Sequence, residues 1–96
     1  MIRTFGDQAT ADVFTGYDSK PARRIPKTLW PVVRRKLDAL QRARTVQDLR
    51  WPSGNRLERL KGDRSDEWSL RVNAQYRITF TFEDGHAYQV ACEDYH

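Results

Sequence analysis

The sequence predicts an α+β domain in which an N-terminal strand and two helices pack on one face of an antiparallel sheet that ends in a meander. Two observations indicate this class. Apolar residues recur at helical spacing between residues 28 and 44, and they alternate with a period of two along three segments between residues 68 and 92. A third observation is the length of 96 residues, which fits a single domain over 1–96.

The N-terminal part is expected to hold a short strand and a short helix. Residues 1–5 are assigned to the strand, with Ile2 and Phe5 facing inward. Asp7 then suits the N-cap of a helix over residues 8–15, because its carboxylate can accept hydrogen bonds from the unpaired N–H groups of the first turn.

The second helix is predicted to begin at Thr28 as its N-cap and to end near residue 43 or 44. Pro31 falls in the first turn, where its missing N–H group costs little. Four apolar residues share one face of this helix and are expected to face the core: Trp30, Val33, Leu37 and Leu40.

The second half of the chain is expected to form the sheet. After a turn-rich loop over 51–55 come a short strand candidate over 56–60 and a polar loop over 61–66. Three alternating segments follow, as expected for a meander with one buried face. The residues assigned to that face are Trp68, Leu70 and Val72, then Tyr76, Ile78, Phe80 and Phe82, then Tyr88, Val90 and Cys92.

Two short turns are expected to join these three segments. A loop over 73–75 joins the first pair, and a turn over 84–86 pairs Glu83 with Ala87. Because side chains alternate between the two faces of a strand, this pairing also determines which residues meet on the face away from the core.

Three charged residues are expected to form a row on that second face. Arg71 lies opposite Arg77, and Arg77 lies opposite Glu93. Two facing arginines repel each other, so the row needs a compensating anion. Either Arg77 and Glu93 form an ordinary cross-strand ion pair, or the row is a site that holds a phosphate.

Charge is segregated along the chain. Residues 20–64 hold fourteen Lys or Arg against four Asp or Glu, a net charge of +10, whereas residues 65–96 carry −4. Thirteen of the seventeen basic residues are Arg, which binds phosphate in a bidentate manner and stacks on bases. This distribution favours a polyanionic partner over a face that merely aids solubility.

Other function classes find no support in the sequence. The single cysteine, Cys92, excludes an internal disulfide, and neither His nor Cys has metal-ligand spacing. Nucleotide-binding glycine motifs, HExxH and GxSxG are absent, so we expect no metal and no cofactor. No apolar run or export signal is seen, and we expect a cytoplasmic protein without a membrane partner.

The last four residues carry groups that can move protons or hold a phosphate. Glu93, Asp94, Tyr95 and His96 follow one another at the end of the last predicted strand. Histidine can give or take a proton near neutral pH, although a terminal histidine is more often a solvated chain end.

Several segments together carry a family resemblance. They are RLERLKGDR at 56–64, WSLRVN at 68–73, YRITF at 76–80 and EDYH at 93–96, and the opening five residues also match. In this order they resemble the HigB toxins of the RelE/ParE superfamily of bacterial toxin–antitoxin systems. The resemblance covers essentially the whole chain, and its motifs are specific as a set rather than one by one.

The resemblance implies a RelE-like fold and a toxin that cuts mRNA in the ribosomal A site. It implies a helix-turn-helix antitoxin of the HigA type, which neutralises the toxin and binds operator DNA, so that the toxin meets this DNA only through the antitoxin. The basic segment would then dock on ribosomal RNA, through Arg23, Arg24, Arg34, Arg35, Arg42 and Arg44.

The catalytic residues implied by the resemblance are Lys61, Arg77, Asp94, Tyr95 and His96. Lys61 and Arg77 would hold the scissile phosphate, and the last three match the terminal catalytic triplet of the family. The supporting residues are Arg71, Glu58 and Glu93. Glu58 stands where some HigB toxins carry His, so either it acts as a base or it is only an edge-strand residue.

Two alternatives remain open at the level of sequence. ParE-type relatives share the fold but inhibit DNA gyrase without catalysis, and such an inhibitor would need neither Lys61 with Arg77 nor the terminal triplet. A plain RNA- or DNA-binding module would also fit the one-sided positive charge. The terminal motif favours the nuclease.

Overall fold

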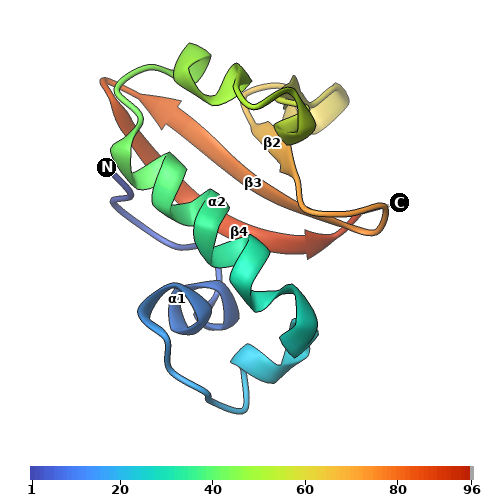
Figure 1. Ribbon diagram of the computed structural model, residues 1–96. Coiled ribbons are helices and arrows are strands. Elements are labelled where there is room, and N and C mark those ends of the chain that lie inside the picture. Colours follow the sequence, from blue (N-terminus) through green and yellow to red (C-terminus); the bar gives the residue numbers. More distant parts are fainter. Residues whose placement is uncertain (96) are drawn as a thin grey trace.

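The computed structural model describes residues 1–95 and confirms the α+β class (Figure 1). His96, one of the candidate catalytic residues, lies outside the described residues. Helix α1 spans Gln8–Thr15 and helix α2 spans Trp30–Arg42. The sheet has four antiparallel strands in the order β1-β2-β3-β4, which are β1 Glu58–Arg59, β2 Trp68–Arg71, β3 Tyr76–Glu83 and β4 His86–Asp94.

The N-terminal segment does not form the predicted continuous strand. It runs parallel to β4 and makes only two isolated bridges, from Ile2 to Ala87 and from Phe5 to Val90. Between these bridges Gln89 has a positive φ of 52°, and its N–H group bonds to the side-chain oxygen of Thr4 instead of a backbone carbonyl. The ladder is therefore interrupted at this point, which explains why the strand prediction is wrong in detail.

Helix α1 begins as the sequence predicts. The carboxylate of Asp7 accepts a hydrogen bond of 2.8 Å from the N–H group of Thr10. Gly16 ends the helix in the left-handed region at φ 81°, where a side chain would be strained. Its buried residues include Ala9 and Val13, which join the core.

Helix α2 has the predicted apolar face but a different start. Thr28 is not its N-cap: a short 3₁₀ turn over Lys27–Leu29 precedes the helix, and Leu29 occupies the cap position without a side-chain hydrogen bond. Pro31 does lie in the first turn and needs no donor there. All four residues of the predicted stripe, Trp30, Val33, Leu37 and Leu40, are buried.

The β2–β3 pairing agrees with the sequence prediction, whereas the turn between β3 and β4 does not. Asp84 and Gly85 form a two-residue turn with positive φ at both positions, so Glu83 pairs with His86 rather than with Ala87. A bulge between residues 79 and 81 of β3 and Gln89 of β4 restores the expected register toward the C-terminus.

The bulge also changes which residues of β4 face the core. Ala87, Val90 and Cys92 are buried, and Tyr88 is not the third member of that set. Burial raises the pKa of the Cys92 thiol to about 12, so the thiol is protonated at neutral pH and packs as an apolar group.

The two helices and the sheet enclose one core. Figure 1 shows α2 lying across one face of the sheet, and α1 contacts both α2 and β4. Core side chains from the sheet, among them Leu70, Ile78 and Phe80, cluster with Val33 and Leu37 of α2. In the part of the chain that the structure describes, neither α1 nor α2 packs on the opposite face of the sheet, where Ser69 and Thr79 are nevertheless buried by neighbouring side chains. Within residues 1–95, no helix is long and apolar enough to cross a membrane.

Candidate active site

The predicted row of charged residues lies on the helix-free face of the sheet. Arg71 pairs with Arg77 across β2 and β3, and Arg77 pairs with Glu93 across β3 and β4. The side chain of Arg77 is only 14% exposed, although it lies on the surface that no helix covers. Neighbouring side chains therefore surround Arg77, and their identity determines what its charge can do.

Arg77 is held by groups from three other parts of the chain. Its Nη1 donates a hydrogen bond of 3.0 Å to the hydroxyl of Ser69 on β2. Its Nη2 lies 3.7 Å from a carboxylate oxygen of Glu58 on β1, and its guanidinium lies 5.3 Å from the ring centroid of Tyr95. The ion pair is long and the Glu58 side chain is 57% exposed, so the charge of Arg77 remains available to an anion.

Glu93 does not form the simple ion pair with Arg77 that its position suggested. Its two carboxylate oxygens accept hydrogen bonds from Arg64 at 2.6 and 3.2 Å, and the hydroxyl of Thr79 also donates to it. Arg64 in turn donates two bonds of 2.8 Å to Glu67. Arg64 is thus the cation that neutralises Glu93, and sequence reasoning missed this role.

This network sets the protonation of its members. Burial acts to raise the pKa of Glu93, but the hydrogen bonds from Arg64 and Thr79 outweigh it and hold that pKa below its ordinary value. Hydrogen bonds to Glu67 and Glu93 raise the pKa of Arg64. Glu93 is therefore an ionised anchor at neutral pH and is unsuited to accept a proton from a substrate.

Lys61 and Glu58 lie at the β1 edge of the same sheet. Glu58 is opposite Ser69 in the β1–β2 ladder, which brings it beside Arg77. Lys61 lies two residues beyond the end of β1, is exposed, and occupies the cap position before the short 3₁₀ turn Gly62–Arg64. Within residues 1–95 it makes no ion pair. Its ammonium group is free to bind an anion at the sheet edge.

Asp94 and Tyr95 stand at the other side of the site, where β4 ends. A carboxylate oxygen of Asp94 accepts a hydrogen bond of 3.0 Å from the side-chain amide of Gln75. The N–H group of Tyr95 donates to the carbonyl of Gln75 at 2.6 Å, which fixes the chain end against the β2–β3 loop. The structure thus brings Tyr95 onto Arg77, with the exposed Asp94 next to it in sequence.

The assembled face combines groups that suit an anionic ligand such as a phosphate. It presents a fixed guanidinium between a phenol ring and a carboxylate, with a free ammonium group at the strand edge. No group of three or more potential ligands that could hold a metal ion occurs among residues 1–95. Oxyanion stabilisation by cations together with proton transfer by side chains is the chemistry this arrangement allows.

Two of the six arginines expected to dock on RNA are already ion-paired. Arg23 bonds Asp18 at 3.0 Å, and Arg24 bonds Asp7 at 3.0 Å and the carbonyl of Cys92 at 3.3 Å. Asp18 also pairs with Lys27, and these bonds lower its pKa. The positive charge of Arg23 and Arg24 is therefore partly compensated, while their docking on RNA remains a prediction.

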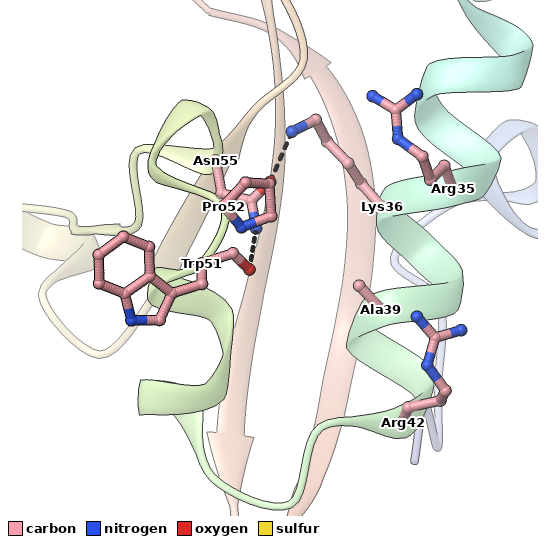
Figure 2. A pocket seen from close by; sticks show the side chains of 7 residues that line it. All are labelled: Arg35, Lys36, Ala39, Arg42, Trp51, Pro52 and Asn55. Atoms are coloured by element: carbon pink, nitrogen blue, oxygen red, sulfur yellow. Dashed lines mark hydrogen bonds between the residues drawn. The ribbon is translucent and has the colours of Figure 1, made fainter.

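The remaining four arginines are less constrained. Arg34 donates to the carbonyl of Val13 at 3.1 Å, whereas Arg35, Arg42 and Arg44 are exposed. Arg35 and Arg42 line a pocket between α2 and the segment after it (Figure 2). That pocket has a volume of about 290 Å³ and includes no residue of the candidate active site.

Solved structures to which the chain is similar include proteins of the YoeB type. The chain is similar over 100% of its length to 98% of a chain in the YoeB–YefM complex from Staphylococcus aureus, with a TM-score of 0.62 and 17% identity. It is also similar to the YoeB dimer from the same organism, with a TM-score of 0.61, 25% identity, and coverage of 99% and 94%. The fold is thus similar to that of YoeB.

The sequence comparison gives the family. The model for the HigB-like toxin, a RelE-like toxin of the type II toxin–antitoxin system HigB, matches residues 4–96. The protein belongs to this family and is a type II toxin. Toxin HigB-1 of Vibrio cholerae serotype O1 is 44% identical over 68 residues, 71% of this chain and 72% of that protein. Endoribonuclease HigB of Proteus vulgaris is 54% identical over 41 residues, 43% and 45% of the two chains.

Proposed function

We propose that this toxin is a ribosome-dependent endoribonuclease that cuts mRNA in the ribosomal A site without a metal. The observation that supports this most directly is Arg77, a nearly buried arginine whose charge faces an open sheet and is only weakly compensated. The name of the Proteus vulgaris relative, an endoribonuclease, supports the same reaction class.

In the proposed reaction a base removes the proton of a 2′-hydroxyl group, and the oxygen attacks the adjacent phosphate. The bond to the 5′-oxygen then breaks, and an acid gives that oxygen a proton. Arg77 and Lys61, with Arg71 in support, would stabilise the added negative charge. Asp94 or His96 would transfer the protons, and Tyr95 would orient or stack on a base.

The arrangement of carboxylates supports this division of labour. Because Arg64 and Thr79 bond Glu93, that carboxylate does not neutralise the facing Arg77. Glu58 is exposed and lies 3.7 Å from Arg77, a distance at which a phosphate can replace it. Glu58 would therefore cover Arg77 in the free protein and move aside when RNA binds.

Dependence on the ribosome fits the lack of a clear pair of proton-transfer groups among the residues described on this face. A strong free-standing ribonuclease needs two well-placed proton-transfer groups, whereas an enzyme that acts on a positioned substrate needs less. The exposed arginines Arg35, Arg42 and Arg44, with the half-buried Arg34 and the ion-paired Arg23 and Arg24, would dock on ribosomal RNA. A helix-turn-helix antitoxin of the HigA type would neutralise the toxin in the cytoplasm and carry the complex to operator DNA.

A translation reaction with a defined mRNA tests the proposal. Purified protein is added with and without ribosomes, and new 5′ ends are mapped by primer extension. We expect cuts only when ribosomes are present, and a loss of at least about 100-fold in cleavage rate for Arg77→Ala. Arg77→Lys keeps the positive charge but loses the planar guanidinium with its paired donors. Its cleavage rate should therefore fall between those of wild type and Arg77→Ala.

Two controls make the result decisive. Circular dichroism and thermal unfolding must show that Arg77→Ala is folded, since its side chain also bonds Ser69. Full cleavage by a folded Arg77→Ala variant would overturn the assignment of the phosphate site. Intact mRNA in both wild-type reactions would overturn the nuclease proposal, and inhibition of DNA supercoiling by gyrase would then be measured.

A further inference from the structure

A second candidate site lies on α2, away from the open sheet face. Its pocket of about 290 Å³ is formed by residues of α2 and by the segment 51–55. Figure 2 shows the side chains of α2 on one side and those of the loop on the other. The lining residues are Arg35, Lys36, Ala39, Arg42, Trp51, Pro52 and Asn55.

The charge of this pocket is entirely positive. Three of its lining residues are basic and none is acidic. Lys36 is buried, and its Nζ donates to the side-chain oxygen of Asn55 at 2.7 Å, so it serves mainly to join the helix to the loop. Burial, and then the nearby Arg35, lower the pKa of Lys36. Arg35 and Arg42 are therefore the cations that remain for a ligand.

The two arginines flank the pocket along the helix axis. They are seven residues apart, which is about two helical turns or roughly 10 Å. Figure 2 shows their guanidinium groups at either end of the lined stretch of α2. Among residues 1–95, neither arginine makes an ion pair. They are placed to bind two separate anionic groups of one ligand.

The loop side of the pocket carries an exposed aromatic ring. Trp51 is 77% exposed, the most exposed of the large hydrophobic side chains that the structure describes. A single exposed apolar residue is ordinary on a protein surface. Trp51 does, however, line the same pocket as Arg35 and Arg42, and Figure 2 shows its ring on the side of the loop that points away from α2. An exposed aromatic ring together with guanidinium groups is the combination with which proteins bind single-stranded nucleic acids, through stacking and phosphate contacts.

The loop that presents Trp51 is fixed to the body of the protein. Asn55 is 3% exposed, and its amide group donates to the carbonyls of Leu49 and Trp51 at 3.2 Å each. The oxygen of the same amide accepts from Lys36 on α2. Because a single buried side chain joins both walls, the pocket is formed before any ligand binds.

We propose that this pocket binds one unstacked nucleotide of single-stranded RNA. The base would stack on Trp51, and the flanking phosphates would contact Arg35 and Arg42. An acidic peptide would use the two arginines but has no need of the indole, so the observations favour RNA. The inference extends the proposed function, from which it takes only the choice of RNA as ligand.

A short RNA that cannot be cleaved tests this pocket directly. The probe is a tetranucleotide whose 2′-hydroxyl groups are methylated, titrated into the full-length protein. The reporter is the indole N–H resonance of Trp51, one of three tryptophans, assigned by its loss in Trp51→Phe. We expect this resonance to shift on binding, and Trp51→Ala to weaken the affinity at least about fivefold.

Arginine variants distinguish RNA binding in the pocket from nonspecific attraction by positive charge. Arg35→Ala and Arg42→Ala should each weaken binding more than Arg50→Ala, the matched control. Arg50 has the same charge and precedes Trp51, but it does not line the pocket and its side chain bonds Gln47. Equal losses for all three variants would reduce the binding to nonspecific attraction and overturn the proposal.

Two further outcomes keep the inference distinct from the proposed nuclease. If the Trp51 resonance does not shift with the RNA, although the protein cuts mRNA on ribosomes, the proposal of RNA binding in this pocket is refuted and the nuclease proposal is not. A Trp51 shift that Arg42→Ala removes, in a protein that cuts no mRNA, would support the pocket and refute the nuclease. Binding of a pentaglutamate peptide in place of the RNA would assign the pocket to an acidic protein partner and overturn the proposal.

Discussion

At the scale of single residues, the central feature is how Arg64 leaves Arg77 free. Arg77 faces Glu93 across the ladder, and without a competitor these two residues would pair. Arg64 bonds both oxygens of Glu93 and both oxygens of Glu67. The alternation of side chains in the strands predicts that Arg77 faces Glu93. It cannot predict that Arg64, from the loop before β2, binds Glu93 instead. Arg64 was visible in the sequence only as part of a motif.

This arrangement predicts a rescue experiment. Arg64→Met removes the cation from Glu93, whose carboxylate is then free to pair with the facing Arg77 and compete with RNA phosphate. We expect cleavage in the translation reaction to fall by about tenfold, the usual size of coupling between residues of one network. Adding Glu93→Gln should restore most of the loss. Equal activity of the single and double variants would show that Arg64 has no influence on Arg77.

The same network predicts a dependence of stability on pH. The pKa of Glu93 is lower in the folded protein than its ordinary value of 4.5. Its stabilising contribution is thus complete above that value and is lost as the pH falls through the folded pKa. Urea unfolding between pH 7 and pH 3 should show a smaller loss of unfolding free energy for Glu93→Gln than for wild type. Parallel curves for the two proteins would contradict the prediction.

At the scale of elements, β4 shows where sequence reasoning succeeds and where it fails. The alternation of Tyr88, Val90 and Cys92 predicts an unbroken strand, yet the backbone turns to a positive φ at Gln89 and brings Ala87 to the core. The bulge inserts one residue, and the Asp84–Gly85 turn is one residue shorter than expected. These two differences cancel, so Arg77 still meets Glu93. An Asp-Gly turn is a strong hairpin signal, whereas nothing in the apolar pattern marks a bulge.

The bulge predicts an unusual sensitivity at Gly6. A Cβ atom there would lie 3.0 Å from the carbonyl oxygen of Gln89 and 3.3 Å from the Cβ of Ala91. Because both neighbours belong to β4, Gly6→Ala should lower the free energy of unfolding by about 1–3 kcal/mol. Gly54→Ala is the control, since nothing lies within 4 Å of its Cβ position. Urea unfolding that shows equal effects would refute the tight packing of the N-terminal segment.

At the scale of the whole molecule, the fold class could be predicted because helical and strand periodicities occupy separate halves of the chain. The resemblance to a toxin family then indicated which open-face residues to compare. The second pocket could not be predicted, because it needs α2 and the 51–55 loop to meet, and neither has a local pattern that specifies this contact. Positive charge was visible in the sequence, but its pairing with acids was not.

That pairing gives the last prediction, on the salt dependence of ribosome binding. Each arginine that contacts a phosphate releases counterions, so the slope of log affinity against log salt counts such contacts. Arg42→Ala should reduce the steepness of this slope by about one, because Arg42 is exposed and has no acidic partner within residues 1–95. Arg23→Ala should change it much less, since Arg23 bonds Asp18. Sedimentation with ribosomes from 50 to 200 mM salt measures both slopes, and equal changes would mean that docking responds to total charge rather than to this surface.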